Sequence, residues 1–218
     1  MNAPAQRRLR ADAARNAERI VRAARLAFDE AGAEVSLEEI ARRAEVGVAT
    51  LYRHFANKEA LIKAVLELGF AEDVHPAIER ARTEEDPWHG LVSVLEATTV
   101  LVNREKWTLK AAKELSAITA ELVTELFSEL AEIMRRAQDA GLVRADLEPD
   151  DLPRVVLMLI STTRLNETAD EDWRRYLALL LDAFRPAAAS PLPPASPLRD
   201  TFPSRQPHIH SSFAKPNR

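Results

Sequence analysis

Residues 35–61, VSLEEIARRAEVGVATLYRHFANKEAL, determine the fold that this chain is expected to adopt. The apolar residues of the first half recur at the spacing of one helical face: Leu37, Ile40, Ala41 and Ala44. This spacing predicts a short helix. Ser36 stands just before that face and Glu39 lies three residues further on, which is the pattern of a capping box at a helix start.

A second short helix follows the break at residues 46–47. Leu51 and Phe55 are four residues apart and would face the first helix. The opposite side is polar, cationic and aromatic, and it consists of Ala49, Thr50, Arg53 and His54 with Tyr52 beside them. A polar and charged surface of this kind is not expected inside a protein core. The stretch therefore predicts a helix-turn-helix over residues 36–55, whose second helix enters a DNA groove.

The same stretch resembles a known family. The run GVATLYRHFANKEAL, residues 47–61, resembles the signature of the TetR family, and RNAERIVRAARLAFDEAG, residues 15–32, resembles that family's first helix. The resemblance implies an all-α protein of about nine helices. In such a protein an N-terminal three-helix DNA-binding domain carries the helix-turn-helix, and a C-terminal helical domain binds ligand and forms the dimer.

Eight residues are predicted to bind DNA: Ser36, Val48, Ala49, Thr50, Tyr52, Arg53, His54 and Lys58. Arg53 suits a bidentate contact to guanine, and Val48 and Ala49 suit thymine methyl groups. The resemblance assigns the other five to phosphate and groove contacts, and phosphate contacts position a protein without reading sequence. Two alternatives stay open. In the first, the Tyr52 ring packs on the turn and does not contact DNA. In the second, Arg53 binds phosphate and reads no base.

Two glutamates depart from the family pattern. Position 45 is commonly glycine in this turn and here is Glu45. If the backbone is left-handed there, a residue with a side chain costs roughly 1 kcal/mol. Its carboxylate would also repel phosphate unless it points away. Glu38 stands where some relatives carry a base-reading arginine, and it can only accept a hydrogen bond, for example from a cytosine amino group.

Composition describes an ordinary globular chain. Of 218 residues, 46% are hydrophobic and 29% are charged, and cysteine is absent. The absence of cysteine excludes disulfides and thiol chemistry and suits a reducing cytosol. No run approaches the ~20 apolar residues of a membrane span, and the first residues lack the apolar centre of a signal peptide. We therefore expect a cytoplasmic, nucleoid-associated protein with no membrane partner.

Charge is distributed unevenly along the chain. Residues 1–65 hold 12 Lys and Arg against 9 Asp and Glu, whereas residues 66–218 hold 18 against 25. A basic end on an acidic body suits a protein that meets DNA at one end. The excess is small enough to arise by chance, so it carries no argument alone.

The chain is expected to divide into four parts. Residues 1–11 are predicted to form a flexible basic arm, residues 13–73 the DNA-binding domain, and residues 74–185 the regulatory and dimerisation domain. Residues 186–218 hold eight of the thirteen prolines and are predicted to be a disordered tail. The arm either follows DNA phosphates or the minor groove, or it is a solvated terminus.

Periodicity and capping residues predict the remaining helices over residues 12–31, 58–82, 87–104, 106–115, 118–140, 150–165 and 169–184. Gly69 and Pro76 are expected to bend the helix over residues 58–82.

The helix over residues 150–165 is apolar on most of its circumference, so both of its sides require cover. We expect a homodimer through a four-helix bundle of the last two helices of each chain. The predicted interface residues are Leu152, Val155, Val156, Leu159, Trp173, Leu177, Leu180 and Phe184. Dimer symmetry would match a palindromic operator in double-stranded DNA. The alternative is that this helix is the centre of a monomeric bundle.

The function that these features indicate is a sequence-specific transcriptional regulator, a repressor released from its operator by a small-molecule effector. The residues predicted to line the effector pocket are Trp88, Thr98, Trp107, Phe127, Met134, Met158 and Thr162. Each of them also suits plain core. The alternative is a helical dimeric interaction protein without specific DNA binding.

An enzyme is not expected. The chain has a single Glu-x-x-His, at residues 72–75, whereas a dimetal helical bundle needs two, and it has no thiol and no glycine-rich phosphate loop. Neither His75, beside Pro76, nor the pair His208 and His210 is accompanied by a full set of residues at metal-ligand spacing. The sequence therefore predicts no cofactor and no metal.

Overall fold

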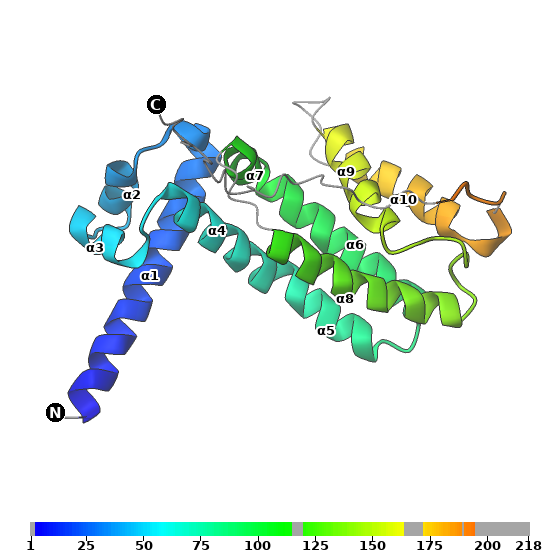
Figure 1. Cartoon of the computed structure of the whole chain (residues 1–218), viewed down its shortest axis with the longest axis horizontal. Helices are drawn as coiled ribbons and strands as arrows, with labels where there is room; N and C mark the ends of the chain where they lie inside the picture. Colours follow the sequence, from blue (N-terminus) through cyan, green and yellow to red (C-terminus); the bar gives the residue numbers. More distant parts are fainter. Residues whose placement is uncertain (1–2, 115–119, 164–171, 189, 195–218) are drawn as a thin grey trace, which may run out of the picture.

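A computed structural model describes residues 3–114, 120–163, 172–188 and 190–194 of the chain (Figure 1). The N-terminal helices are α1 (Ala3–Ala31), α2 (Leu37–Arg43), α3 (Val48–His54), α4 (Lys58–Gly69) and α5 (His75–Thr83). The C-terminal helices are α6 (Pro87–Arg104), α7 (Lys106–Glu114), α8 (Ala120–Asp139), α9 (Asp151–Thr163) and α10 (Asp172–Phe184). A π-helical turn, Phe70–Val74, joins α4 to α5 without a break. No strand occurs in these ranges, so the predicted all-α fold of about nine helices is confirmed.

The core of the N-terminal part lies where α1, α2, α3 and α4 meet. Ile20, Phe28, Ile40, Leu51 and Leu61 are fully buried there. The helical spacing seen in the sequence therefore does place one face of each short helix inside. The buried cluster also contains Ala111 and Ala112 of α7. This packing ties the N-terminal part to α7, which lies beyond the boundary predicted at residue 73.

A second core fills the C-terminal part, with α6 at its centre. α6 packs against α5, α8 and α9, and α9 packs against α10. Leu91, Val94 and Leu95 of α6 are fully buried in this cluster, together with Leu152 and Leu159 of α9. Along the long axis of the molecule, α2 and α3 lie near one end and α10 lies toward the other (Figure 1).

The predicted bend between residues 58 and 82 takes the form of the π-helical turn. Gly69 comes just before it, and Pro76 lies just after it, where the proline has no N–H to donate to the preceding turn of this continuous helix. A Cβ atom on Gly69 would lie 2.6 Å from Cδ1 of Leu101 on α6. The absence of a side chain at Gly69 therefore allows α4 to approach α6 this closely.

The ends of the chain correct two predictions. The predicted arm over residues 1–11 is helical from Ala3 onward, because α1 begins there. Alanine, arginine, glutamine and leucine in this stretch favour a helix, and Pro4 lies in the first turn, where it is tolerated.

The start of the predicted disordered tail packs on the protein. Pro186–Ala188 form a 3₁₀ turn, and Nη2 of Arg144 donates to the carbonyl oxygen of Ser190 at 2.5 Å. The backbone N–H of Leu192 donates to Oδ2 of Asp146 at 2.9 Å. Residues 195–218, with His208 and His210, lie outside the described ranges.

The structure also corrects which side of α9 and α10 faces outward. Seven of the eight predicted interface residues are buried inside the chain's own core, namely Leu152, Val155, Val156, Leu159, Trp173, Leu177 and Phe184, and Leu180 packs partly buried against them. The outward side instead carries Leu157, Met158, Tyr176 and Leu179, with Leu179 57% and Met158 50% exposed. An apolar circumference gives no signal of which side meets the chain's own core, and this is why the prediction chose the inner side.

Candidate nucleic-acid interface

Ser36 caps the start of α2. Its Oγ accepts a hydrogen bond from the backbone N–H of Glu39 at 3.1 Å, as the sequence pattern predicts. The hydroxyl still has its own hydrogen to donate. This geometry is compatible with the predicted phosphate contact, which stays a prediction.

The reciprocal half of the capping box is replaced by ion pairs. The Glu39 carboxylate accepts from Nε of Arg42 and from Nε of Arg43, both at 2.8 Å. Hydrogen bonds from these two guanidinium groups lower the pKa of Glu39 to about 2. Glu39 therefore carries its charge into the first turn of α2, where the helix dipole favours an anion.

The turn between α2 and α3 is left-handed at Glu45, whose φ is 52°. The backbone expected from the family pattern is thus present with a glutamate in place of glycine. The Glu45 carboxylate does not stand alone, because its Oε2 lies 3.1 Å from Nη2 of Arg19 on α1. The pairing offsets a negative charge that would otherwise face any anion bound beside the turn.

The outer face of α3 is open to solvent at the end of the molecule (Figure 1). Val48 is 38% exposed, Tyr52 is 46% exposed, and Ala49 and Arg53 are also exposed. Leu51, on the opposite side, is fully buried. Since nearly half of the Tyr52 side chain is exposed, part of it stays accessible even where the rest packs on the turn.

Thr50 and His54, one helical turn apart, are half-buried at one border of that face. The structure therefore gathers six of the eight predicted DNA-binding residues on one short helix. Glu38 is also exposed, on the first turn of α2. Their contacts to DNA stay predictions.

Lys58 has a different environment from the one predicted. Its Nζ donates to the backbone carbonyl of Val35 at 2.6 Å and lies 6.0 Å from the centre of the Phe28 ring. Burial lowers the pKa of this ammonium, and the nearby Glu34 opposes the shift. At least one of its three donors holds the segment between α1 and α2, so the role visible for Lys58 is a structural one.

Arg19 is a residue of this site that the sequence analysis missed. Besides Glu45, its Nη2 donates to the carbonyl of Ala44 at 2.7 Å. The two partners lie 25 and 26 residues away along the chain. Helical periodicity cannot detect such a contact. The available signal was the glutamate at a left-handed position, which calls for a compensating cation nearby.

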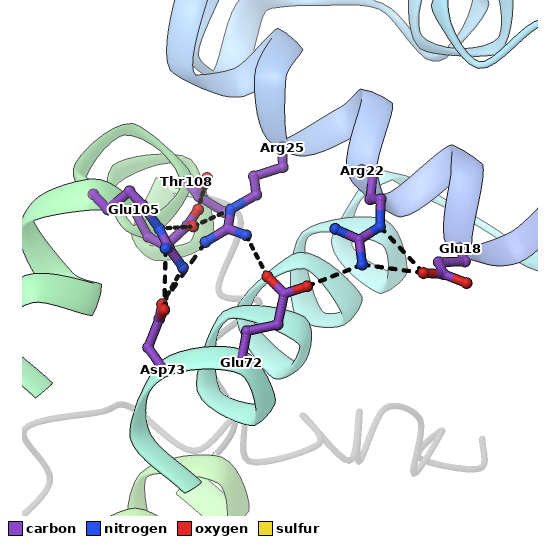
Figure 2. A network of polar contacts seen from close by, with 8 residues as sticks. Glu18, Arg22, Arg25, Glu72, Asp73, Glu105 and Thr108 are labelled. Atoms are coloured by element: carbon purple, nitrogen blue, oxygen red, sulfur yellow. Dashed lines mark hydrogen bonds and ion pairs between the residues drawn. The ribbon is translucent and has the colours of Figure 1, made fainter. Parts of the chain in front are cut away.

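The N-terminal and C-terminal parts meet at a charged network (Figure 2). Nε of Arg25 on α1 lies 2.5 Å from Oε1 of Glu105, and its Nη1 lies 2.9 Å from Oε2 of Glu72. The Glu105 side chain is only 2% exposed. Its other oxygen accepts from Oγ1 of Thr108 at 3.1 Å. A carboxylate this buried needs opposite charge and hydrogen bonds, and Arg25 of the N-terminal part supplies both.

The network extends to either side of Arg25. Arg22 bridges Glu72 at 3.0 Å and Glu18 at 3.1 Å, while Arg104 binds the carboxylate of Asp73. Burial raises the pKa of Asp73. These contacts join α1, the π-helical turn and the end of α6.

The structure does not gather the residues predicted for the effector pocket around one cavity. Thr98 and Met134 are fully buried in the C-terminal core, whereas Met158 is on the outer surface. Trp88 lies under the guanidinium of Arg185, 3.5 Å from the ring centre.

Phe127 is half-buried against the same core, and the side chain of Thr162 is outside the described residues. Trp107 is 40% exposed. It lines an open cleft of about 350 Å³ with Asp29, Glu30, Ala31, Gly32, Glu34 and Lys110. The predicted pocket thus stays a prediction.

Two general properties of the described residues concern membranes and metals. None of their helices has both the length and the apolar character needed to cross a membrane. No three of their His, Asp or Glu side chains gather in a way that would hold a metal ion.

Comparison with known proteins gives matches over both parts of the chain. A family model described as "Bacterial regulatory proteins, tetR family" matches residues 20–65. A second, described as "Transcriptional regulator SbtR-like, C-terminal domain", matches residues 89–186. Among curated proteins, the HTH-type transcriptional regulator SAB2452 of Staphylococcus aureus (strain bovine RF122 / ET3-1) is 33% identical over 91 residues, which are 41% of this chain and 47% of that protein. The chain thus matches about half the length of its curated relatives.

Solved structures match over more of the chain. The TetR transcription regulatory protein from Mycobacterium vanbaalenii is 31% identical, with a TM-score of 0.56, over 81% of this chain and 99% of that one. AibR, solved in complex with isovaleryl coenzyme A and operator DNA, is 21% identical, with a TM-score of 0.55, over 78% of this chain and 98% of that one. At that identity, AibR shows a shared fold only.

Proposed function

Because the chain belongs to the TetR family of bacterial regulatory proteins, we propose that it is a sequence-specific DNA-binding transcriptional regulator in the cytoplasm, a repressor that a small-molecule effector releases from its operator. The observation that carries this proposal is the outer face of α3. An exposed valine, alanine, tyrosine and arginine stand on a short helix whose other side is anchored by the fully buried Leu51. This combination suits a helix that enters the major groove.

The roles proposed for that face follow from its chemistry. Arg53 reads guanine by a bidentate contact, and Val48 and Ala49 touch thymine methyl groups. Thr50, Tyr52, His54 and Ser36 hold phosphates, as a helix start and polar side chains commonly do. Lys58 stays a predicted contact to the DNA backbone, although its ammonium already donates to the carbonyl of Val35.

DNA binding is tested by fluorescence anisotropy with a duplex from the region upstream of the protein's own gene and a scrambled duplex of equal length. We expect preference for the first duplex and an affinity that falls linearly with salt on logarithmic axes. Arg53→Ala should weaken specific binding by about tenfold or more, because a bidentate base contact is worth about 1–3 kcal/mol. Arg82→Ala, on α5 and away from α3, is the matched control. Equal affinity for both duplexes would contradict a sequence-specific regulator.

We propose that the functional form is a homodimer whose interface is the outward side of α9 and α10. This side exposes Leu157, Met158, Tyr176 and Leu179, and exposed apolar clusters on soluble proteins commonly mark an interface. Two-fold symmetry would place two α3 helices about one DNA turn apart, roughly 34 Å, and so select a palindromic operator.

The effector proposal is supported by the junction between the two parts of the chain. Glu105, beside the C-terminal core, accepts hydrogen bonds from both Arg25 of α1 and Thr108 of α7, so a ligand that shifts α6 or α7 would move the helix-turn-helix. AibR has been solved with both isovaleryl coenzyme A and operator DNA, and its fold is shared. A ligand that favours one of two dimer geometries changes DNA affinity by its differential affinity for them.

Effector release is tested by titrating a panel of small molecules calorimetrically and then measuring operator affinity with each ligand that binds. We expect at least one ligand to lower that affinity. If no ligand that binds changes DNA affinity, effector-controlled release is wrong, while the DNA-binding proposal stands on its own experiment.

A second candidate function is a helical dimeric interaction protein without specific DNA binding. The observation that favours it is the pair of exposed carboxylates, Glu38 and Glu45, beside the outer face of α3. The contact of Glu45 with Arg19 reduces this objection. Absence of any preferred duplex in the anisotropy experiment would favour this second function.

A further inference from the structure

We propose that Arg19 is the positioning residue of the helix-turn-helix: it holds the left-handed turn at Glu45 and so fixes the direction in which α3 presents its outer face. This inference rests on the proposed DNA-binding function. It assigns control of the helix-turn-helix geometry to Arg19 of α1, a residue outside both α2 and α3.

The end of α2 is closed by a particular hydrogen-bond motif. The N–H of Glu45 donates to the carbonyl of Arg42 at 3.1 Å, and the N–H of Val46 donates to the carbonyl of Ala41 at 3.0 Å. These two bonds form a Schellman motif, whose left-handed residue is usually glycine. Here that residue is Glu45, with φ 52°.

A Schellman motif leaves later carbonyls of the helix without an internal donor. Arg19 supplies a donor to one of them, because its Nη2 lies 2.7 Å from the carbonyl oxygen of Ala44 and 3.4 Å from that of Glu45. The same nitrogen lies 3.1 Å from the Glu45 carboxylate. A cation at a helix C-terminus also interacts favourably with the helix dipole.

Arg19 is held in place by the core on which it stands. Its neighbour Ile20 is fully buried among α1, α2 and α4. The guanidinium therefore reaches the turn from a rigid helix rather than from a loop.

The direction of α3 depends on this turn. α3 begins at Val48, three residues after Glu45, and Gly47 is extended at its N-cap. A residue with a side chain disfavours the left-handed region, so Glu45 gains freedom to leave it when its partner is removed. Since only residues 44–47 separate the two helices, a change of backbone angles at Glu45 swings α3 relative to α2.

The test is a cycle of four full-length proteins: the natural chain, Arg19→Met, Glu45→Gly and the double variant. Methionine keeps the aliphatic stem of arginine, and glycine adopts the left-handed conformation without strain. Arg82→Met is the matched control, because Arg82 is 43% exposed and Arg19 is 47% exposed, and both lie in ion pairs. Thermal unfolding confirms that each variant is folded.

The first readout is amide hydrogen exchange at position 45 and at Val46 and does not involve DNA. We expect Arg19→Met to speed exchange about fivefold with Glu45 present, since a hydrogen bond to a charged group is lost. In the Glu45→Gly background we expect Arg19→Met to speed exchange about twofold or less. Glycine adopts the left-handed conformation without a stabilising contact, and water can solvate the Ala44 carbonyl. Equal exchange in the natural chain and Arg19→Met would overturn the proposal.

The second readout is affinity for the duplex that the natural chain selects from a random-sequence library, compared with a random duplex. We expect Arg19→Met to weaken binding of the selected duplex about tenfold with Glu45 present and markedly less in the Glu45→Gly background, a coupling of the size seen for residues in contact. An equal loss in both backgrounds, with the salt slope reduced by about 0.9 per protomer, would mean that Arg19 binds phosphate directly and would overturn the positioning role. If the natural chain selects no sequence, the proposed function fails, and the exchange experiment still decides whether Arg19 holds the turn.

Discussion

At the scale of single residues, Lys58 shows how a cation beside an exposed polar helix can serve the fold. Its position at the start of α4 resembles that of a lysine that meets the DNA backbone. In the structure its Nζ donates to Val35, a residue that is 6% exposed. The bond satisfies a carbonyl between α1 and α2, where no regular helix supplies a donor.

Lys58→Met is therefore expected to lower the free energy of unfolding by about 1–3 kcal/mol, the cost of leaving a buried polar group without its partner. Urea unfolding followed by circular dichroism measures this change. Lys63→Met is the matched control, because its Nζ lies 3.8 Å from Glu67 on an exposed helix face and such pairs contribute about 0.5 kcal/mol or less. Equal losses in the two variants would contradict a structural role for Lys58.

Glu39 allows a test by pH. Arg42 and Arg43 hold its pKa at about 2, below its ordinary value of 4.5. A carboxylate with a lowered folded-state pKa stabilises the protein above its unfolded-state pKa and loses that contribution as pH falls toward the folded-state pKa. We expect the difference in unfolding free energy between the natural chain and Glu39→Gln to be constant above about pH 5 and to shrink between about pH 4.5 and 2.

Chemical unfolding at several pH values measures this difference, with Glu38→Gln on the same turn as the control. A difference that is independent of pH across that window would show that the ion pairs of Glu39 do not stabilise α2.

At the scale of helices, the elements that could be predicted from sequence are those set by local chemistry. Asp86 accepts from the N–H of Trp88 and Pro87 follows it, and α6 begins there as expected. α8 ends at Asp139, next to the predicted end at residue 140, and Gly141, with φ 70°, follows. Caps and glycine turns act within a few residues, so the sequence alone carries the information.

Contacts between distant residues could not be predicted in this way. Leu152 and Leu157 are both apolar on α9, but one is fully buried and the other 44% exposed. The pairing of Arg19 with Glu45, and of Arg25 with Glu105, joins residues far apart in the chain. Periodicity identifies a helical face but does not identify its partner.

The junction between the two parts gives a prediction at this scale. Arg25→Met leaves the Glu105 carboxylate, 2% exposed, without its closest cation. Losing one partner of a buried pair costs about 3–5 kcal/mol, and because Arg25 keeps 17% exposure we expect a smaller loss, about 2–3 kcal/mol. Adding Glu105→Gln to this variant should restore part of the loss, because no buried charge then remains.

Thermal and urea unfolding measure both variants, with Arg22→Met as the control. Arg22 is 53% exposed, and ion pairs of exposed side chains contribute little to stability. If Arg25→Met is no more damaging than Arg22→Met, the network does not hold the two parts together.

At the scale of the whole molecule, the outward side of α9 and α10 is the surface that the proposed dimer buries. Leu179→Glu should weaken self-association by about a hundredfold or more, because it would place an uncompensated charge in an apolar interface. Light scattering after size-exclusion chromatography measures the mass. Leu26→Glu is the matched control, since Leu26 is 63% exposed on α1, and this variant should keep the dimer mass. A monomeric natural chain would contradict the proposed assembly.

In the proposed dimer, the face of α3 reads DNA as half of a symmetric pair, and this is a testable claim. Selection of duplexes from a random-sequence library by the full-length protein tests it most directly. We expect enrichment of a palindrome whose half-site centres lie about 10 base pairs apart or a little more. We also expect that Arg53→Ala loses preference at one position of each half-site. A library that is no different after selection than before it would contradict the claim.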